Sequence, residues 1–167
     1  MKNLVLIIFF VLLLLPNVHA EIKDYEAEVN DNGVTALDIK VWQVDVDGTG
    51  RSGEVGYNFF VLQPFTKIFR KTSDGPMFAV MSTVTPVDEV HSIFNSWVVM
   101  NYGHDVPDAQ IRGFQDKVIA QDIAVIESQR PELLPLDLQA ELHLRADRTS
   151  IAYRQWLNEL GVGFGTS

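Results

Sequence analysis

Hydrophobic residues in the second half of the chain recur with the period of an α-helix over residues 107–129. At about 100° per residue, the apolar residues of this segment fall within roughly 60° of Asp122 on a helical wheel. They are Ile111, Val118, Ile119, Val125 and Ile126. We therefore predict one long amphipathic helix whose apolar stripe contains a carboxylate. A buried carboxylate is costly unless it is protonated, hydrogen-bonded, paired or bound to a metal, so Asp122 is the first candidate for function.

The first half of the chain is rich in β-branched and aromatic residues and carries turn signals at intervals. Asn32-Gly33 predicts a hairpin, Pro64 a break or an edge position, and the sequence from Ser73 to Pro76 a turn. Strands are expected near residues 24–30, 34–46, on either side of Pro64 within 56–71, at 77–86 and at 91–102. In the last of these strands, Phe94, Trp97 and Val99 are predicted to line the core or a ligand cavity.

Helices follow the strands. Arg130-Pro131 ends the long helix, and a last helix is expected from Asp147, as the N-cap, to Leu160, with Gly161 as a C-cap. Successive antiparallel strands followed by helices predict an α+β domain with one curved sheet packed on the long C-terminal helix.

Residues 1–20 contain a basic Lys2, an apolar run from Leu4 to Leu15 and a small-residue site at Val18-His19-Ala20. This order is typical of a secretory signal peptide and too short for a comfortable membrane span of about 20 residues. We therefore expect a secreted or periplasmic protein if the signal functions, with one domain over residues 21–167. An uncleaved anchor and an upstream translation artefact are the alternatives.

Composition narrows the chemistry. The net charge is −9, and without residues 1–20, which hold one lysine, 12 basic residues face 22 acidic ones. Nucleic acid is therefore a poor partner, because nothing in the sequence would neutralise its phosphates. The chain has no cysteine, which excludes disulfides, Cys nucleophiles, thiolate zinc sites and Cys-ligated iron–sulfur clusters, so no 2Fe-2S cluster can form on it.

Other metal signals are weak. The four histidines are scattered, and the loop after Asp45 resembles a calcium loop only through Asp45, Asp47 and Thr49, with no glutamate at the twelfth position. For Asp122, two interpretations remain open. It pairs with an inward arginine such as Arg145, Arg148 or Arg154, or it is the carboxylate of an iron site built from two histidines and one carboxylate.

The segments TPVDEVHS (85–92), MNYGHD (100–105) and residues 114–161 resemble the C-terminal half of Rieske non-haem iron oxygenase α subunits. The similarity is to the ring-hydroxylase and O-demethylase branch, which includes vanillate-demethylase-like and pheophorbide-oxygenase-like enzymes. It covers roughly residues 22–167 and implies a helix-grip (START-like) fold around an apolar substrate cavity. The resemblance also allows a homo-oligomer.

In that family the long helix carries the third ligand of a mononuclear Fe(II). The matching stretch here is Gln121-Asp122-Ile123-Ala124-Val125-Ile126-Glu127-Ser128-Gln129, so the resemblance implies that Asp122 is a metal ligand. Gln121 stands where many members have Glu. The family's cluster-binding Cys-x-His and Cys-x-x-His pairs and its Asp-x-x-His-x-(four)-His segment do not occur in this sequence.

Two functions follow from these observations. The resemblance implies a catalytic-domain fragment of an oxygenase that uses dioxygen to hydroxylate or demethylate an aromatic or apolar substrate, in a cytoplasmic setting, and that is inactive alone. The alternative is a secreted helix-grip module that binds a hydrophobic ligand without metal. Assembly with a separate Rieske-bearing polypeptide is a third possibility.

Overall fold

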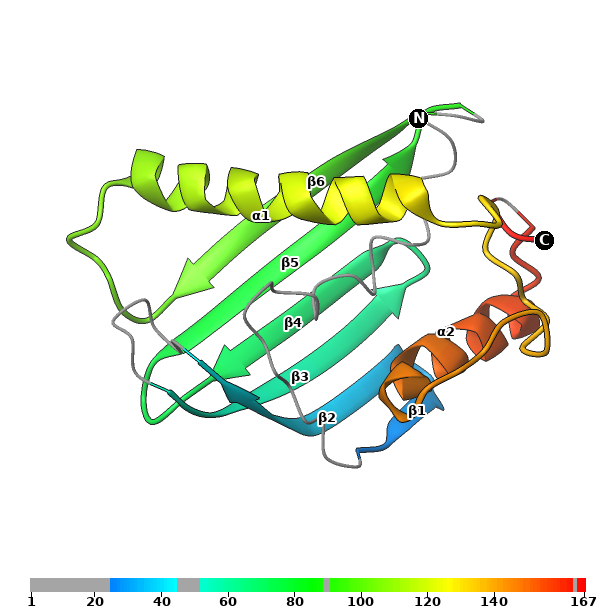
Figure 1. Cartoon of the computed structure of the whole chain (residues 1–167), viewed down its shortest axis with the longest axis horizontal. Helices are drawn as coiled ribbons and strands as arrows, with labels where there is room; N and C mark the ends of the chain where they lie inside the picture. The colour runs from blue at the N-terminus through cyan, green and yellow to red at the C-terminus, as the bar shows by residue number, and fades with distance from the viewer. Residues whose placement is uncertain (1–24, 45–51, 89–90, 164) are drawn as a thin grey trace.

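A computed structural model describes residues 25–44, 52–88, 91–163 and 165–167. Within these residues, six strands form one antiparallel sheet in the order of the sequence, so each strand pairs with its neighbour along the chain (Figure 1). The strands are β1 (Ala27–Asn30), β2 (Gly33–Gln43), β3 (Gly53–Gln63), β4 (Thr66–Thr72), β5 (Met77–Pro86) and β6 (Ser92–Met100). The predicted segment 1–20 and the weak calcium-loop signal at residues 45–49 lie outside the described residues.

Turn residues explain where the strands end. Gly33 has φ +116° directly after the β1–β2 turn, a conformation that glycine adopts without a steric penalty. Pro64 lies between β3 and β4, so of the two roles considered for this proline, the break between strands is confirmed. The turn predicted from Ser73 to Pro76 joins β4 to β5, and an N–H of Ser73 donates to the carbonyl oxygen of Pro76 at 3.1 Å.

An irregularity on β2 bends the sheet. The register of β2 against β3 shifts between Ala36 and Ile39, and Asp38 within this bulge has φ 54°. The backbone N–H of Asp38 donates to the side-chain oxygen of Asn58 at 2.8 Å, which satisfies a group that the ladder leaves unpaired. Bulges increase local twist, so this one contributes to the curvature of the sheet.

The two α-helices of the described part of the chain lie on the same face of the sheet (Figure 1). α1 (Asp108–Ser128) crosses the β5–β6 side, and α2 (Arg148–Glu159), preceded by a 3-10 turn at Arg145–Asp147, lies over β1 and β2. Both helices are confirmed within a residue or two of the predicted bounds, and Gly161 follows α2 with φ +67°. Among the described residues, neither helix is long and apolar enough to cross a lipid bilayer.

The core lies between the sheet and the helices. Tyr153 and Leu157 of α2 are fully buried and pack against inward residues of the sheet, among them Val34, Val61 and Val84. The Tyr153 hydroxyl donates to the carbonyl oxygen of Pro64. The architecture is therefore α+β, with a curved antiparallel sheet gripping helices on one face, as predicted.

The opposite face of the sheet holds two of the residues predicted to line the core or a ligand cavity. In β6, Phe94 is half-buried against the core, but Val99 is 66% exposed and Trp97 is 52% exposed. The prediction for Val99 is wrong because side chains alternate between the two faces of a strand, and Val99 has the opposite parity from Phe94.

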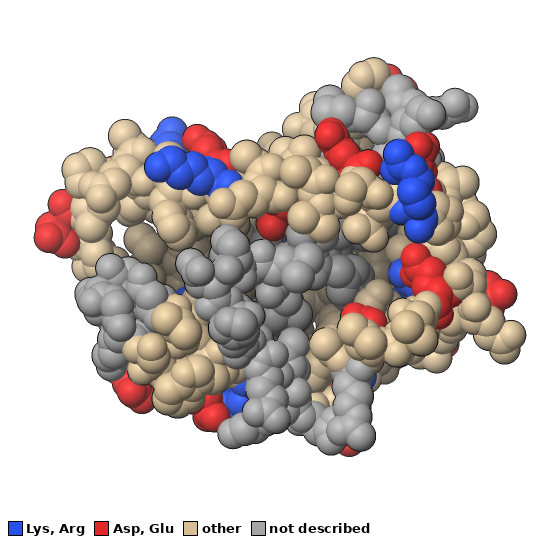
Figure 2. Space-filling view, in the orientation of Figure 1, with Lys and Arg blue, Asp and Glu red and all other residues tan. Residues whose placement is uncertain are grey.

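Figure 2 shows the molecule in the orientation of Figure 1. On this side, the described Lys and Arg side chains are few and stand beside Asp and Glu.

Candidate functional site

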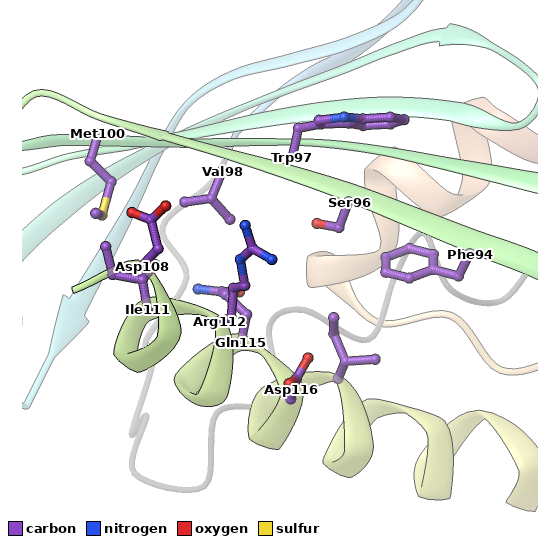
Figure 3. Close-up of a pocket in the computed structure, with 11 residues that line it drawn as sticks. Phe94, Ser96, Trp97, Val98, Met100, Asp108, Ile111, Arg112, Gln115 and Asp116 are labelled. Atoms are coloured by element: carbon purple, nitrogen blue, oxygen red, sulfur yellow. The ribbon is translucent and has the colours of Figure 1, made fainter.

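A cavity of about 610 Å³ lies between β6 and the first half of α1 (Figure 3). From the strand, Phe94, Ser96 and Val98 line it, because alternate residues of β6 share the face toward the helix. From α1, side chains at helical spacing line it: Ile111, Arg112, Gln115, Asp116 and Ile119. Trp97 also borders the cavity, although its ring lies on the other side of the β6 ribbon from α1 (Figure 3). The cavity therefore brings six apolar side chains together with five polar or charged ones, a larger polar share than small-molecule sites usually have.

Asp122 lies one turn beyond Ile119 on the same helix and is half-buried. Burial raises the pKa of this carboxyl, while the positive charge of Lys67 acts in the opposite direction. The prediction that Asp122 faces inward is therefore supported by its half-burial and by a cationic neighbour on the sheet.

Lys67 of β4 is that neighbour, and sequence analysis missed it. Its side chain is 1% exposed, and burial lowers its pKa to about 8, with the attraction of Asp122 opposing this shift. The Nζ atom also lies 5.9 Å from the centre of the Phe69 ring. Lys67 alternates with Phe65 and Phe69 in the sequence, and this alternation indicates that its side chain points inward. Its proximity to Asp122 depends on how α1 crosses the sheet and cannot be predicted from the sequence.

Two of the three arginines considered as partners of Asp122 make other contacts. Arg154 forms an ion pair with Glu141, with 2.5 Å between Nη2 and Oε2, and Arg148 donates to the main-chain oxygen of Tyr25 at 2.6 Å. The side chain of Arg145 lies outside the described part of the chain. Pairing of Asp122 with Arg154 is therefore wrong.

The three histidines that the structure describes do not join Asp122. His91 contacts the carboxylate of Asp88 at 2.9 Å, His143 lies 2.9 Å from the carbonyl oxygen of Leu138, and His104 is exposed in a loop. Within the described ranges, no group of three or more His, Cys, Asp or Glu side chains is placed to hold a metal ion. The described donor set thus offers Asp122 alone toward an iron ion, which is too few ligands for a mononuclear iron site.

Three polar side chains form a row across the inner face of the sheet. Lys67 is directly opposite Ser82 of β5, and Ser82 is directly opposite Ser96 of β6. Ser82 is 2% exposed, and its hydroxyl has no hydrogen-bond partner among the described residues. The row ends at Ser96 in the cavity wall.

Comparison with known proteins gives a consistent set of matches. Residues 50–162 match the family described as the vanillate O-demethylase oxygenase C-terminal domain. A probable methylxanthine N7-demethylase from Pseudomonas sp. (strain TJI-51) is 39% identical over 118 residues, which cover 68% of this chain and 41% of that protein.

Two relatives from Pseudomonas putida match a shorter segment. A methylxanthine N1-demethylase is 37% identical over 90 residues, and these cover 54% of this chain and 24% of the relative. A methylxanthine N3-demethylase is 32% identical over 90 residues, covering 53% and 24% respectively. The chain thus matches between a quarter and two fifths of the length of these three relatives.

Proposed function

Because this chain belongs to the vanillate O-demethylase oxygenase C-terminal domain family, the C-terminal domain of Rieske oxygenase α subunits, we propose that it forms the substrate-binding part of an oxygenase catalytic domain. The reaction is oxidative demethylation or hydroxylation of a small aromatic or heterocyclic molecule. The three relatives are methylxanthine demethylases by name, which supports demethylation of a methylated heterocycle as the first activity to test.

The observation that carries this proposal is the cavity beneath α1. Its volume of about 610 Å³ lies within the range of small-molecule sites, roughly 300–1,000 Å³. Phe94, Val98 and Ile119 offer apolar contact to a planar ring, and Arg112, Gln115 and Asp116 offer polar contacts that could fix its orientation.

Asp122 is proposed as one ligand of a mononuclear Fe(II). It lies one helical turn beyond the cavity, so a metal held there would stand close to a bound ring. The sequence holds no Asp-x-x-His-x-(four)-His segment and no cysteine, so the two histidine ligands and the electron-delivering cluster would have to come from polypeptide outside the printed sequence. By itself, the printed chain is expected to bind iron weakly and to be inactive.

Bound iron would supply dioxygen activation. In the overall demethylation, an N-methyl or O-methyl group and one dioxygen molecule, with two electrons and two protons, give the demethylated product, formaldehyde and water. Residues of this chain would bind the ring, orient its methyl group toward the metal and exclude water.

The test is a chimera in which the N-terminal part of the methylxanthine N7-demethylase relative precedes the matched segment of this chain. We expect the chimera to bind iron and, with a reductase, to release formaldehyde from a methylated xanthine. Asp122→Asn should remove both iron and activity while keeping the melting temperature within a few degrees. Asp105→Asn, in the exposed loop before α1, is the matched control. An iron content unchanged by Asp122→Asn would exclude Asp122 from the site.

A further inference from the structure

β6 forms one edge of the described sheet and lacks the features that usually protect an edge strand. Among the described strands, only β5 pairs with it. β6 is nine residues long, contains no charged residue and no proline, and pairs with β5 without a shift in register. β1 at the other edge is protected, because it is four residues long and carries Glu28. A long, regular and uncharged edge strand such as β6 is a site for pairing with another strand.

Hydrogen bonds at both ends of β6 identify which of its main-chain groups point away from β5. The carbonyl oxygen of His91 accepts from the N–H of Val87 at 3.0 Å, and the N–H of Asn101 donates to the carbonyl oxygen of Met77 at 3.2 Å. Residues of an antiparallel strand alternate in this respect, and the register is continuous along β6. The odd-numbered residues of β6 therefore bond to β5, whereas the N–H and carbonyl groups of its even-numbered residues point to the free edge.

The cavity beside this edge is incomplete. Every residue that lines it belongs to β6 or to α1, and no other described element closes the space between them. In Figure 1, α1 crosses over β6, and the first half of the helix lies beyond the free edge of the strand. Ser96 lines the cavity and is nevertheless exposed, as are Arg112 and Asp116 of α1. The cavity therefore lacks a wall at the edge of β6.

We propose that the free edge of β6 binds an extended polypeptide segment as an additional strand, which lies beneath the first half of α1 and completes the cavity. This inference rests on the proposed function, because the segment belongs to the polypeptide that supplies the two histidines and the electron-delivering cluster. A row of free main-chain donors and acceptors is matched by another extended main chain, so the partner is a polypeptide rather than a small molecule or a nucleic acid.

A second copy of this chain fits the edge poorly. Antiparallel pairing of β6 with β6 would place a two-fold axis perpendicular to the sheet, so the helices of both copies would lie on the same side. There, the α1 of the second copy would meet the α1 that already crosses the edge strand (Figure 1). A single added strand needs a width of only about 4.8 Å in the plane of the sheet.

The relatives carry polypeptide that could provide this strand. The match covers 41% of the methylxanthine N7-demethylase relative, so more than half of that protein lies outside it.

The side chains of β6 define the chemistry of the segment. Ile93, Trp97 and Val99 on the open face of the sheet are each more than half exposed. Phe94 and Val98 on the face toward α1 border the cavity. An uncharged segment with apolar residues on both faces would cover both sets, because directly opposite side chains of paired strands contact each other.

Amide hydrogen exchange, measured residue by residue by NMR, tests the added strand. The chain alone is compared with the chimera that carries the N-terminal part of the methylxanthine N7-demethylase relative. In the chain alone, we expect the N–H groups of Phe94, Ser96 and Val98 to exchange at least tenfold faster than those of Asn95 and Trp97, which bond to β5. In the chimera, exchange at the three even-numbered residues should slow at least tenfold.

Ser96→Pro and Ser96→Ala form a matched pair in the chimera. Proline removes the N–H that points to the free edge, whereas alanine keeps it, and neither change removes a hydrogen bond to β5. We expect Ser96→Pro to return Phe94 and Val98 to the exchange rates of the chain alone, and Ser96→Ala to leave their rates within twofold. If Ser96→Pro unfolds the sheet, the comparison of the two unaltered proteins still decides the proposal.

Three results would overturn the added strand. These are equal exchange at even- and odd-numbered residues of β6 in the chain alone, unchanged exchange at the even-numbered residues in the chimera, or slower exchange of the chain alone at higher protein concentration. The last result would make a second copy the partner. The iron content of the chimera tests the proposed function separately. A chimera that holds iron while Ser96 and Val98 exchange as fast as in the chain alone would refute the strand and keep the proposed function.

Discussion

Lys67 carries an ammonium group into the interior of the protein, where its charge is poorly solvated. Burial lowers its pKa from the usual 10.5 to about 8. Near neutral pH both the folded and the unfolded chain hold this proton, so the folded state bears the full cost of the buried charge. At 1.36 kcal/mol per pH unit, the difference in pKa corresponds to roughly 3 kcal/mol.

Lys67→Met should therefore raise the free energy of unfolding at pH 7, by less than roughly 3 kcal/mol because it also removes the positive charge that offsets the burial of Asp122. Between pH 8 and 10.5, unfolded Lys67 keeps a proton that folded Lys67 has released, so the wild-type free energy of unfolding rises with pH. The advantage of the variant should shrink over this range. Urea unfolding of both proteins at several pH values measures the difference in unfolding free energy. A difference that does not change with pH would contradict the lowered pKa of Lys67.

Gly33 is a second residue with a specific requirement. An added Cβ would lie 1.9 Å from the carbonyl oxygen of Val61, and the backbone has φ +116°. Gly33→Ala should destabilise the protein by about 3 kcal/mol or more, since steric overlap adds to backbone strain. Gly75→Ala is the matched control: it has φ +107° but nothing within 4 Å of the new Cβ, so strain alone should cost about 1–2 kcal/mol. If thermal or urea unfolding shows that both variants lose the same free energy of unfolding, the backbone has moved to relieve the overlap at residue 33.

At the scale of elements, α1 and α2 are held differently. Of the described residues of α1 only Ile126 is fully buried, whereas α2 buries five residues, including Tyr153 and Leu157. The difference has a simple cause, because half of α1 borders a cavity instead of packed side chains. We infer that α2 contributes more to stability and that α1 is positioned for function.

Leu157 and Leu160 allow a matched test on α2, since one is fully buried and the other is 51% exposed at the C-cap. Leu157→Ala should lower the free energy of unfolding by about 2–5 kcal/mol because it removes buried methyl groups and leaves a cavity. Leu160→Ala should change it by less than about 0.5 kcal/mol. Similar losses in urea unfolding would contradict the assigned burial.

Elements were predictable because their signals are local. Asn32-Gly33, Pro64, Arg130-Pro131 and Asp147 each set a boundary through their own backbone preferences, and the structure places strand and helix ends beside them. Side-chain environments were less predictable. The prediction for Val99 takes the wrong face because it leaves strand parity out, and the electrostatic interaction between Lys67 and Asp122 joins residues 55 positions apart.

At the scale of the whole molecule, the described helices cover one face of the sheet and leave the other open. On the open face, the register aligns Phe60, Ile68, Met81 and Trp97 across four strands, and Met81 and Trp97 are more than one-third exposed. No sequence pattern distinguished this row from the core, because both faces carry apolar residues and only the placement of the helices separates them. The candidate site was likewise predictable only as far as Asp122; its cavity and polar row required the tertiary structure.

The order of the strands also bears on how the chain folds. Every pairing in the sheet joins neighbours in sequence, whereas α2 is tied to the start of the described chain by Tyr25, whose hydroxyl donates to the carbonyl oxygen of Ala146 at 2.7 Å across 121 positions. Hairpins close short loops and form early, while contacts between distant segments form late.

Leu157→Ala should therefore speed unfolding and barely slow folding, whereas Val80→Ala in the centre of the sheet should mainly slow folding. Stopped-flow folding and unfolding rates in urea measure both effects, and a slower folding rate for Leu157→Ala would place the docking of α2 before the rate-limiting step.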